Sequence, residues 1–258
     1  MKKSTYKKEV SSFLQTNFKN ITFLVVLMIA TAISSNVQAQ ISTFPYQEGW
    51  EDGGFGSWTQ PASNSTDWEN DTGTTDSSFA TGPDGASEGS NYIHPDASDA
   101  SAGDQIIIEN NFDLTQISGT PELLFDYHMY FSGDQTDGQL DVYVSTNGGV
   151  TFTNEFNRTG EQNTSNADPF NTATVDLSAY GSNSSVTIRF VATIGATPNN
   201  FSHDVSIDDV RVREQPSCQI PSNLTTSNIS QTGANLVWGQ VGNANTYEYV
   251  VMLSGNAP

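Results

Sequence analysis

Carboxylates and tryptophans crowd into one short stretch near the start of this sequence, and they are the residues best suited to chemistry. The stretch is Gly49–Trp68, which holds three tryptophans among glycines and has Glu51 near its start. A second acidic segment, Ile207–Val210, lies far along the chain and carries Asp208 and Asp209. Carboxylate oxygens are ligands that Ca²⁺ prefers in proteins. We expect the two segments to meet and to hold one domain together through a calcium ion.

The sequence lacks the familiar motifs of catalysis. It contains no His-Glu-x-x-His, no Gly-x-Ser-x-Gly and no phosphate loop. Its three histidines have no metal-ligand spacing with one another or with the single cysteine: His94, His128 and His203. Asp204, Ser206 and Asp208 share a parity on one strand, which a glycosidase could use, but this is a weak pattern. We therefore expect no enzymatic activity from these residues.

The first 39 residues are typical of a secretory signal peptide. Five lysines precede an apolar run, Ile21–Ile33, and Val37-Gln38-Ala39 offers a cleavage site before Gln40. The alternative is a transmembrane anchor, but the apolar run is shorter than the roughly 20 residues that a span needs. We expect cleavage, so that the protein is secreted or displayed at the cell surface and is not an integral membrane protein.

The remaining chain is strongly acidic. The leader takes five of the nine basic residues and one of the 29 acidic residues, which leaves four arginines, 28 acids and a net charge of −24. Such a surface repels nucleic acid and anionic membranes, because nothing on it neutralises phosphate. It would attract divalent cations or basic partners, although acidity also serves simply to keep a secreted protein soluble. Because Cys218 is the single cysteine, no internal disulfide can form.

Alternating apolar residues predict short β-strands throughout residues 40–214. The strongest strand is Leu123–Phe131, whose odd positions are all apolar, and its even-numbered His128 is expected to be half-exposed. In the last strand, Val205 and Ile207 have one parity but Val210 and Val212 have the other. This change requires an extra residue, and we predict a bulge at Asp208-Asp209.

About nine such strands and no helical apolar stripe predict an all-β fold, an antiparallel β-sandwich. The tryptophans of the opening stretch could form a sugar-stacking platform, but in a sandwich of this size we favour a place in the core. The segment Ser145–Phe152 resembles a sialidase Asp-box with Asn147 at the Asp position. Since it occurs only once, we interpret it as a tight hairpin.

Several ordered motifs in the region 40–214 resemble those of a MAM domain, an extracellular module with a jelly-roll fold. The matching segments are Trp50-Glu51, Gly56-Ser57-Trp58, Thr81–Asp84, Leu124–Met129 and Ile207–Val210. The paired cysteines of animal MAM domains are missing, which points to a bacterial relative. In jelly rolls related to this family, acids near the first and last strands can share an ion. The resemblance therefore implies a calcium site, with four candidate ligands: Glu51, Asp84, Asp208 and Asp209.

The segment 215–258 resembles the first half of a fibronectin type III domain, an Ig-like sandwich, with Trp238 as its core tryptophan. A complete domain of this kind needs about 100 residues, so we expect an incomplete one here. The two resemblances imply a non-catalytic adhesion or binding module that takes an extracellular protein or glycan as ligand. Two alternatives stay open: an accessory C-terminal region of an exported peptidase or other hydrolase, and a carbohydrate-binding module.

Overall fold

The computed structural model describes residues 40–61, 66–75, 81–132, 136–196, 202–216, 223–230 and 232–239. The predicted leader, residues 1–39, and Cys218 lie outside these ranges. Contacts divide the chain into two compact units, Met1–Arg213 and Glu214–Pro258. None of the helices in the described ranges is long and apolar enough to cross a membrane.

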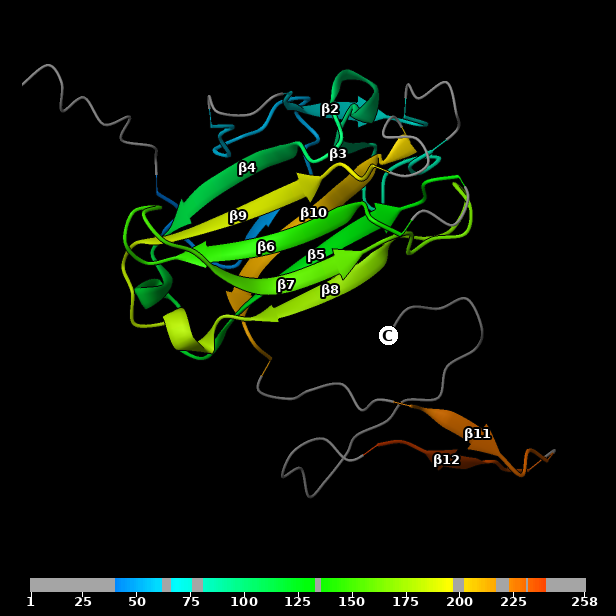
Figure 1. The fold of residues 1–258 in the computed structure, drawn as a ribbon. Helices are drawn as coiled ribbons and strands as arrows, with labels where there is room; N and C mark the ends of the chain where they lie inside the picture. The colour runs from blue at the N-terminus through cyan, green and yellow to red at the C-terminus, as the bar shows by residue number, and fades with distance from the viewer. Residues whose placement is uncertain are drawn as a thin grey trace, which may run out of the picture. The chain divides into compact units, whose positions relative to one another are not determined.

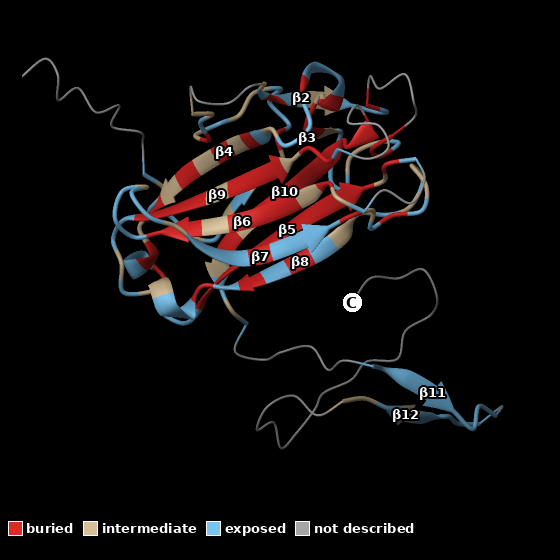
Figure 2. Cartoon of the chain, viewed as in Figure 1, coloured by how far each residue is buried: buried red, intermediate tan, exposed pale blue. Residues whose placement is uncertain are grey.

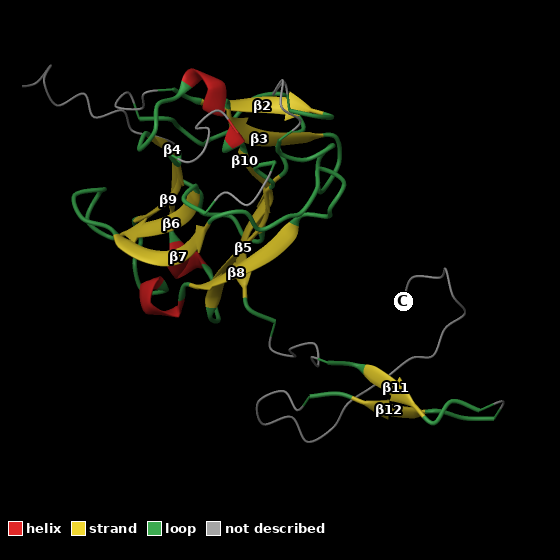
Figure 3. Cartoon of the chain, turned by 45° about the vertical axis from the view of Figure 1, so that its right-hand side comes forward, coloured by secondary structure: helices red, strands yellow, loops and turns green. Residues whose placement is uncertain are grey.

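The first unit is an antiparallel sandwich of two sheets, as predicted (Figures 1 and 3). The six-stranded sheet has the order β2 (Trp68–Thr72), β3 (Asn91–Pro95), β10 (Val205–Glu214), β5 (Pro121–Met129) and β8 (Asn171–Asp176), with β1 (Tyr46–Glu48) also paired to β10. The four-stranded sheet has the order β4 (Gln105–Phe112), β9 (Val186–Thr193), β6 (Gln139–Ser145) and β7 (Thr153–Thr159). Short 3₁₀ turns at Ala97–Asp99, Leu114–Gln116 and Ser178–Tyr180 are its helices within the described ranges.

The core lies between the two sheets and is rich in aromatic rings. Trp50, Trp58 and Trp68 are almost fully buried in it, so their predicted core role is confirmed. Trp58 packs edge-on against Trp50 and Phe112, and its indole Nε1 donates a hydrogen bond to the Tyr46 hydroxyl at 2.9 Å. The tryptophans of the opening stretch therefore fill part of the space between the two sheets and contribute to the core.

Strand β5 is buried on both of its faces, which the alternation in its sequence did not predict. Its odd positions belong to the core, as expected, but all nine residues are buried (Figure 2). The expectation that His128 is half-exposed is wrong, because its side chain has no exposed surface. The ring of Phe170, in the loop before β8, packs against the His128 ring at 5.4 Å and covers this part of the strand.

Strand β10 changes its parity at Asp208-Asp209, as predicted. Val205 and Ile207 lie in the core, and so do Val210 and Val212 beyond the switch. Asp209 has a φ of 47°, in the left-handed region that adds the extra residue. The same point separates two pairing partners, since Ile207 pairs with β3 whereas Val210 and Val212 pair with β1.

The predicted meeting of the two ends of the region is thus confirmed by the antiparallel pair of β1 and β10. The predicted hairpin between β6 and β7 is also present. There Asn147 Oδ1 accepts hydrogen bonds from the backbone N–H groups of Val150 and Thr151 at 3.1 and 3.0 Å.

The second unit contains one described antiparallel pair, β11 (Thr225–Ser227) and β12 (Asn235–Val237). Residues 240–258, the rest of the segment expected to form this domain, lie outside the described residues. Assignment of this unit to the fibronectin type III family stays a prediction.

Candidate functional site

The outer face of the six-stranded sheet carries a layer of buried polar side chains. They come from β3, β5, β10 and the residue before β10, and each is at most 9% exposed: Tyr92, His94, Asp126, His128, Asp204, Ser206 and Asp208. Ile207 pairs with Ile93 and both point into the core, so their neighbours in sequence point outward together. Loops that precede β3 and β8 contact this layer.

Asp208 fixes the loop that precedes β3. Its Oδ2 accepts hydrogen bonds from the backbone N–H groups of Ser87 and Glu88 at 2.8 and 2.9 Å. Burial raises the pKa of Asp208 to about 7, and the N–H donors oppose that rise. Asp126 on β5 holds the same loop, since its Oδ2 accepts from the Ser87 hydroxyl at 2.5 Å. Two carboxylates therefore converge on Ser87.

Asp204 fixes an earlier part of the same covering segment. Its carboxylate accepts hydrogen bonds from the Thr81 hydroxyl at 2.5 Å and from the Ala97 backbone N–H at 3.2 Å. Burial is the largest cause that raises its pKa. Asp204, Ser206 and Asp208 do share one side of β10, but all three are buried, so this trio does not form an open cleft of the glycosidase kind.

Glu51, from the opening stretch, binds the end of the loop that precedes β3. Its Oε1 accepts from the backbone N–H groups of Ser90 and Asn91, both at 2.8 Å, and these bonds lower the pKa of Glu51. Gly89 has a φ of 64°, and a Cβ added there would collide with the Glu51 carboxyl group. This glycine is thus required for the close approach of Glu51 to the loop backbone.

The four predicted calcium ligands are used in different ways. Glu51 and Asp208 both bind the backbone of the segment 87–91, Asp209 binds Gln47 and Arg211, and Asp84 lies exposed on the preceding turn. The described ranges contain no group of three or more His, Cys, Asp or Glu side chains arranged to hold a metal ion. One oxygen of Glu51 and one of Asp208 each accept two backbone N–H groups, whereas the Asp84 carboxylate accepts no hydrogen bond from the described residues. The calcium site stays a prediction.

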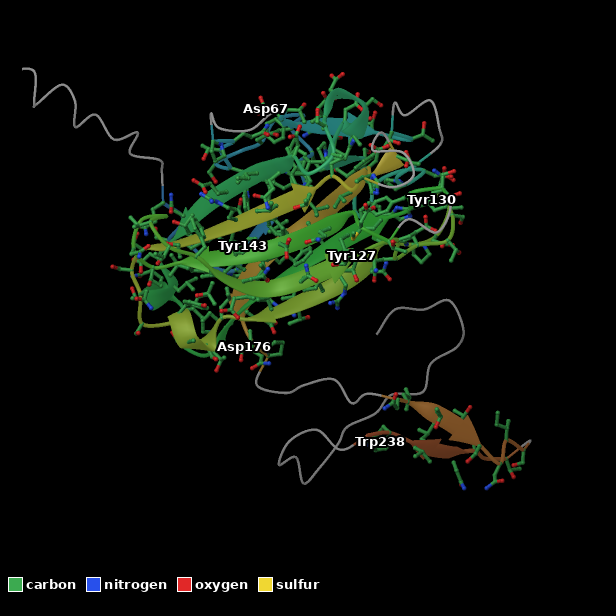
Figure 4. All side chains as sticks on the ribbon, in the orientation of Figure 1. Asp67, Tyr127, Tyr130, Tyr143, Asp176 and Trp238 are labelled. Carbon is green, nitrogen blue, oxygen red and sulfur yellow. The ribbon has the colours of Figure 1, made fainter. Side chains whose placement is uncertain are left out.

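A pocket of about 410 Å³ lies where two loops meet above β5, lined by Pro83–Ser87 and Asn166–Phe170. The loops are joined by two hydrogen bonds, from the Asp84 N–H to the Asn166 carbonyl and from Asn166 Nδ2 to the Gly82 carbonyl, each 3.0 Å long. The Gly82 N–H in turn donates to the carbonyl of Tyr130, which is labelled in Figure 4 and follows β5.

Residues 166–170 are the part of the site that sequence reasoning missed. A local signal exists, because Asp168 follows Thr164 and Ser165 in a polar turn. The Asp168 carboxylate accepts from the backbone N–H and hydroxyl groups of both residues, which lower its pKa to about 2. The aromatic Phe170 directly after that turn packs against the Tyr92 and His128 rings and so brings the loop over the sheet.

The MAM domain family, described as meprin/A5/mu, matches residues 49–219. The chain belongs to this family. The match runs from the tryptophan-rich stretch through the end of β10, so it includes every strand of the two sheets except β1, and both loops of the pocket. No curated protein matches the sequence.

The chain is also similar to solved structures at low sequence identity. A cleaved adhesin domain of Lys-gingipain from Porphyromonas gingivalis is 14% identical, with a TM-score of 0.45 over 67% of this chain and 99% of that one. The CBM22-2 xylan-binding domain of Paenibacillus barcinonensis Xyn10C is 13% identical, with a TM-score of 0.41 over 66% and 99%. The secreted serine protease VesC from Vibrio cholerae is 19% identical, with a TM-score of 0.30 over 46% and 20%.

The geometry of the loops and the pocket suits the binding of a ligand. Most buried acids of the polar layer accept hydrogen bonds from loop backbone or hydroxyl groups and so act as supports for the loops. The pocket above them has a wall of backbone and small side chains, one aromatic ring and two carboxylates. A rigid sheet that positions ligand-contacting loops is a common arrangement in binding modules.

Proposed function

We propose that this chain is a secreted or cell-surface binding module that performs no catalysis and holds an extracellular protein partner. The observation that carries the proposal is the match of the whole sandwich to the MAM family, an extracellular module. The pocket between the loops Pro83–Ser87 and Asn166–Phe170 is its binding site, because its volume falls in the range of about 300–1,000 Å³ typical of ligand sites.

Two further elements complete the proposal. Calcium stabilises the region around Glu51 and Asp208, where acidic side chains from the two ends of the domain approach one loop. Residues 215–258 begin a fibronectin type III domain.

The experiment is to express the full chain in a bacterial host, locate it by fractionation, and test the exported protein for binding. Immobilised extracellular proteins and a glycan panel are the two sets of ligands. We expect export, binding to a protein, and no hydrolysis of peptide or glycan substrates. Retention in the cytoplasm would refute the secreted module, and turnover of a substrate would refute the non-catalytic one.

The glycan panel separates the remaining alternative. Binding to a polysaccharide without binding to any protein would assign the chain to the carbohydrate-binding modules.

A further inference from the structure

The pocket between the two loops has a negative charge and no basic residue to balance it. Its lining contains Asp84 and Asp168 and no lysine, arginine or histidine. Asp168 remains ionised at every physiological pH, because its four hydrogen-bond donors lower its pKa to about 2. A cationic ligand is therefore favoured, and an anionic one is repelled.

The two carboxylates differ in what they still offer to a ligand. Both oxygens of Asp168 already accept hydrogen bonds from Thr164 and Ser165. The Asp84 side chain is exposed and accepts no hydrogen bond from the described residues, although its backbone N–H is fixed to the Asn166 carbonyl. Asp84 thus presents two unoccupied oxygens from a fixed backbone position, which suits a bidentate donor.

An aromatic ring forms another part of the same wall. Phe170 is half-buried, and its ring is supported from the sheet by the rings of His128 and Tyr92, at 5.4 and 6.4 Å. Burial lowers the pKa of His128 to about 4, so this neighbour is neutral at physiological pH and does not repel a cation. A planar cation can stack on an aromatic face while it pairs with a nearby carboxylate.

No cation of the described chain is left over for this pocket. The mature sequence has no lysine after residue 19, and each of its arginines already has a partner. Arg189, Arg211 and Arg213 form ion pairs with Glu109, Asp209 and Glu122, and Arg158 lies over the Phe156 ring. The cation must therefore come from another molecule.

We propose that this pocket receives an arginine side chain of the extracellular protein partner, with the guanidinium paired to Asp84 and stacked on Phe170. This proposal rests on the function proposed above, since it names the chemistry by which the same site would hold its partner. Arginine is favoured over lysine because only the guanidinium is planar and has the fork of donors that matches two carboxylate oxygens.

The test measures binding of a short blocked peptide with one central arginine to the full exported chain, by fluorescence anisotropy. Matched peptides carry lysine or the neutral isostere citrulline at the central position. We expect the arginine peptide to bind about tenfold more tightly than the lysine peptide, and the citrulline peptide to show no measurable binding.

Two variants separate the pocket from the general acidity of the chain. Asp84→Asn should weaken arginine-peptide binding by about tenfold. Glu88→Gln removes one exposed charge from the same loop outside the pocket lining and should change binding by less than about twofold. Phe170→Leu should weaken binding while near-ultraviolet circular dichroism shows a folded domain.

Equal losses of arginine-peptide affinity in Asp84→Asn and Glu88→Gln would overturn the proposal. Binding of the citrulline peptide would also overturn it, as would the absence of arginine-peptide binding at millimolar concentration. The proposed function has a separate outcome. If the chain still captures an immobilised extracellular protein and Asp84→Asn does not affect that capture, the module stands and the arginine pocket is refuted.

Discussion

At the scale of single residues, two buried titratable groups on the sheet's outer face have pKa values shifted in opposite senses. Burial lowers the pKa of His128 to about 4, so the folded state binds its proton less well than the unfolded state does. Its contribution to stability is lost as the pH falls from about 6.5 to about 4. Burial raises the pKa of Asp208 to about 7, so its contribution is lost as the pH rises from about 4 to about 7.

These opposite slopes make a prediction about pH. His128→Phe removes the part of the unfolding free energy that rises with pH and leaves the part due to Asp208, which falls with pH. The unfolding free energy of this variant, relative to wild type, should therefore fall as the pH rises from about 4.5 to 6.5. In Asp208→Asn the difference from wild type should have the opposite sign, and each slope should be at most about 1.4 kcal/mol per pH unit. Urea unfolding in EDTA at several pH values measures both. Slopes of the same sign in the two variants would contradict this assignment of the pKa shifts.

A second residue-scale prediction concerns the glycine under Glu51. Gly89→Ala should cost about 1–3 kcal/mol of stability, because the backbone there has a φ of 64° and the new Cβ would displace the Glu51 carboxyl group. Gly85→Ala is the matched control in the same covering segment, since nothing lies within 4 Å of its added Cβ and its φ is not positive. Chemical denaturation of the two variants checks the difference, and equal stabilities would show that Glu51 does not need this approach.

At the scale of elements, β10 organises the six-stranded sheet because it pairs with different partners on the two sides of its parity switch. The first half pairs with β3 and the second half with β1. Asp209 lies between the two halves. Its left-handed backbone shifts the alternation by one residue, so that the apolar side chains of both halves point into the core.

The backbone of that switch predicts a ranking of substitutions. Asp209→Asn should be tolerated best, because asparagine adopts the left-handed region readily. Asp209→Val should cost about 2–3 kcal/mol, since a β-branched residue is strained at a φ of 47°. Asp209→Ala should have an intermediate stability cost, because it removes the ion pair with Arg211 but is not β-branched. Thermal unfolding gives the order, and a valine variant as stable as the asparagine variant would show that no strain is stored there.

The strands could be predicted well from the sequence, but the loops and side chains that pack over the sheet could not. Alternation identified β5 and the change of parity in β10, because inward-facing residues repeat every second position. It could not show that Phe170, some forty residues beyond His128, lies on the second face of β5. Likewise, Glu51 and Asp208 were expected to converge on a calcium ion, but the backbone N–H groups of residues 87–91 that bind their oxygens were not foreseen. Backbone donors leave no trace in residue types, so the sequence shows the acids but not the N–H groups that bind them.

At the scale of the whole molecule, the residues after position 39 carry a net charge of −24 and repel one another, so a bound divalent cation would stabilise the folded state. We expect EDTA to lower the melting temperature of the chain and calcium to restore it. Asp209→Ala should reduce that response. An unchanged melting temperature in EDTA would mean that the N–H groups of residues 87–91 suffice to hold the carboxylates without a metal.

The pairing of β10 with both β1 and β3 also determines when the domain can form during synthesis. Strands β1, β3 and β5 are all made before residue 205, yet the strand that lies between them comes at the end of the domain. A chain that has emerged only as far as β9 carries exposed strand edges and cannot close its larger sheet. Contacts between such distant segments form slowly. The nascent protein must therefore be kept from aggregating until its last strand has been made.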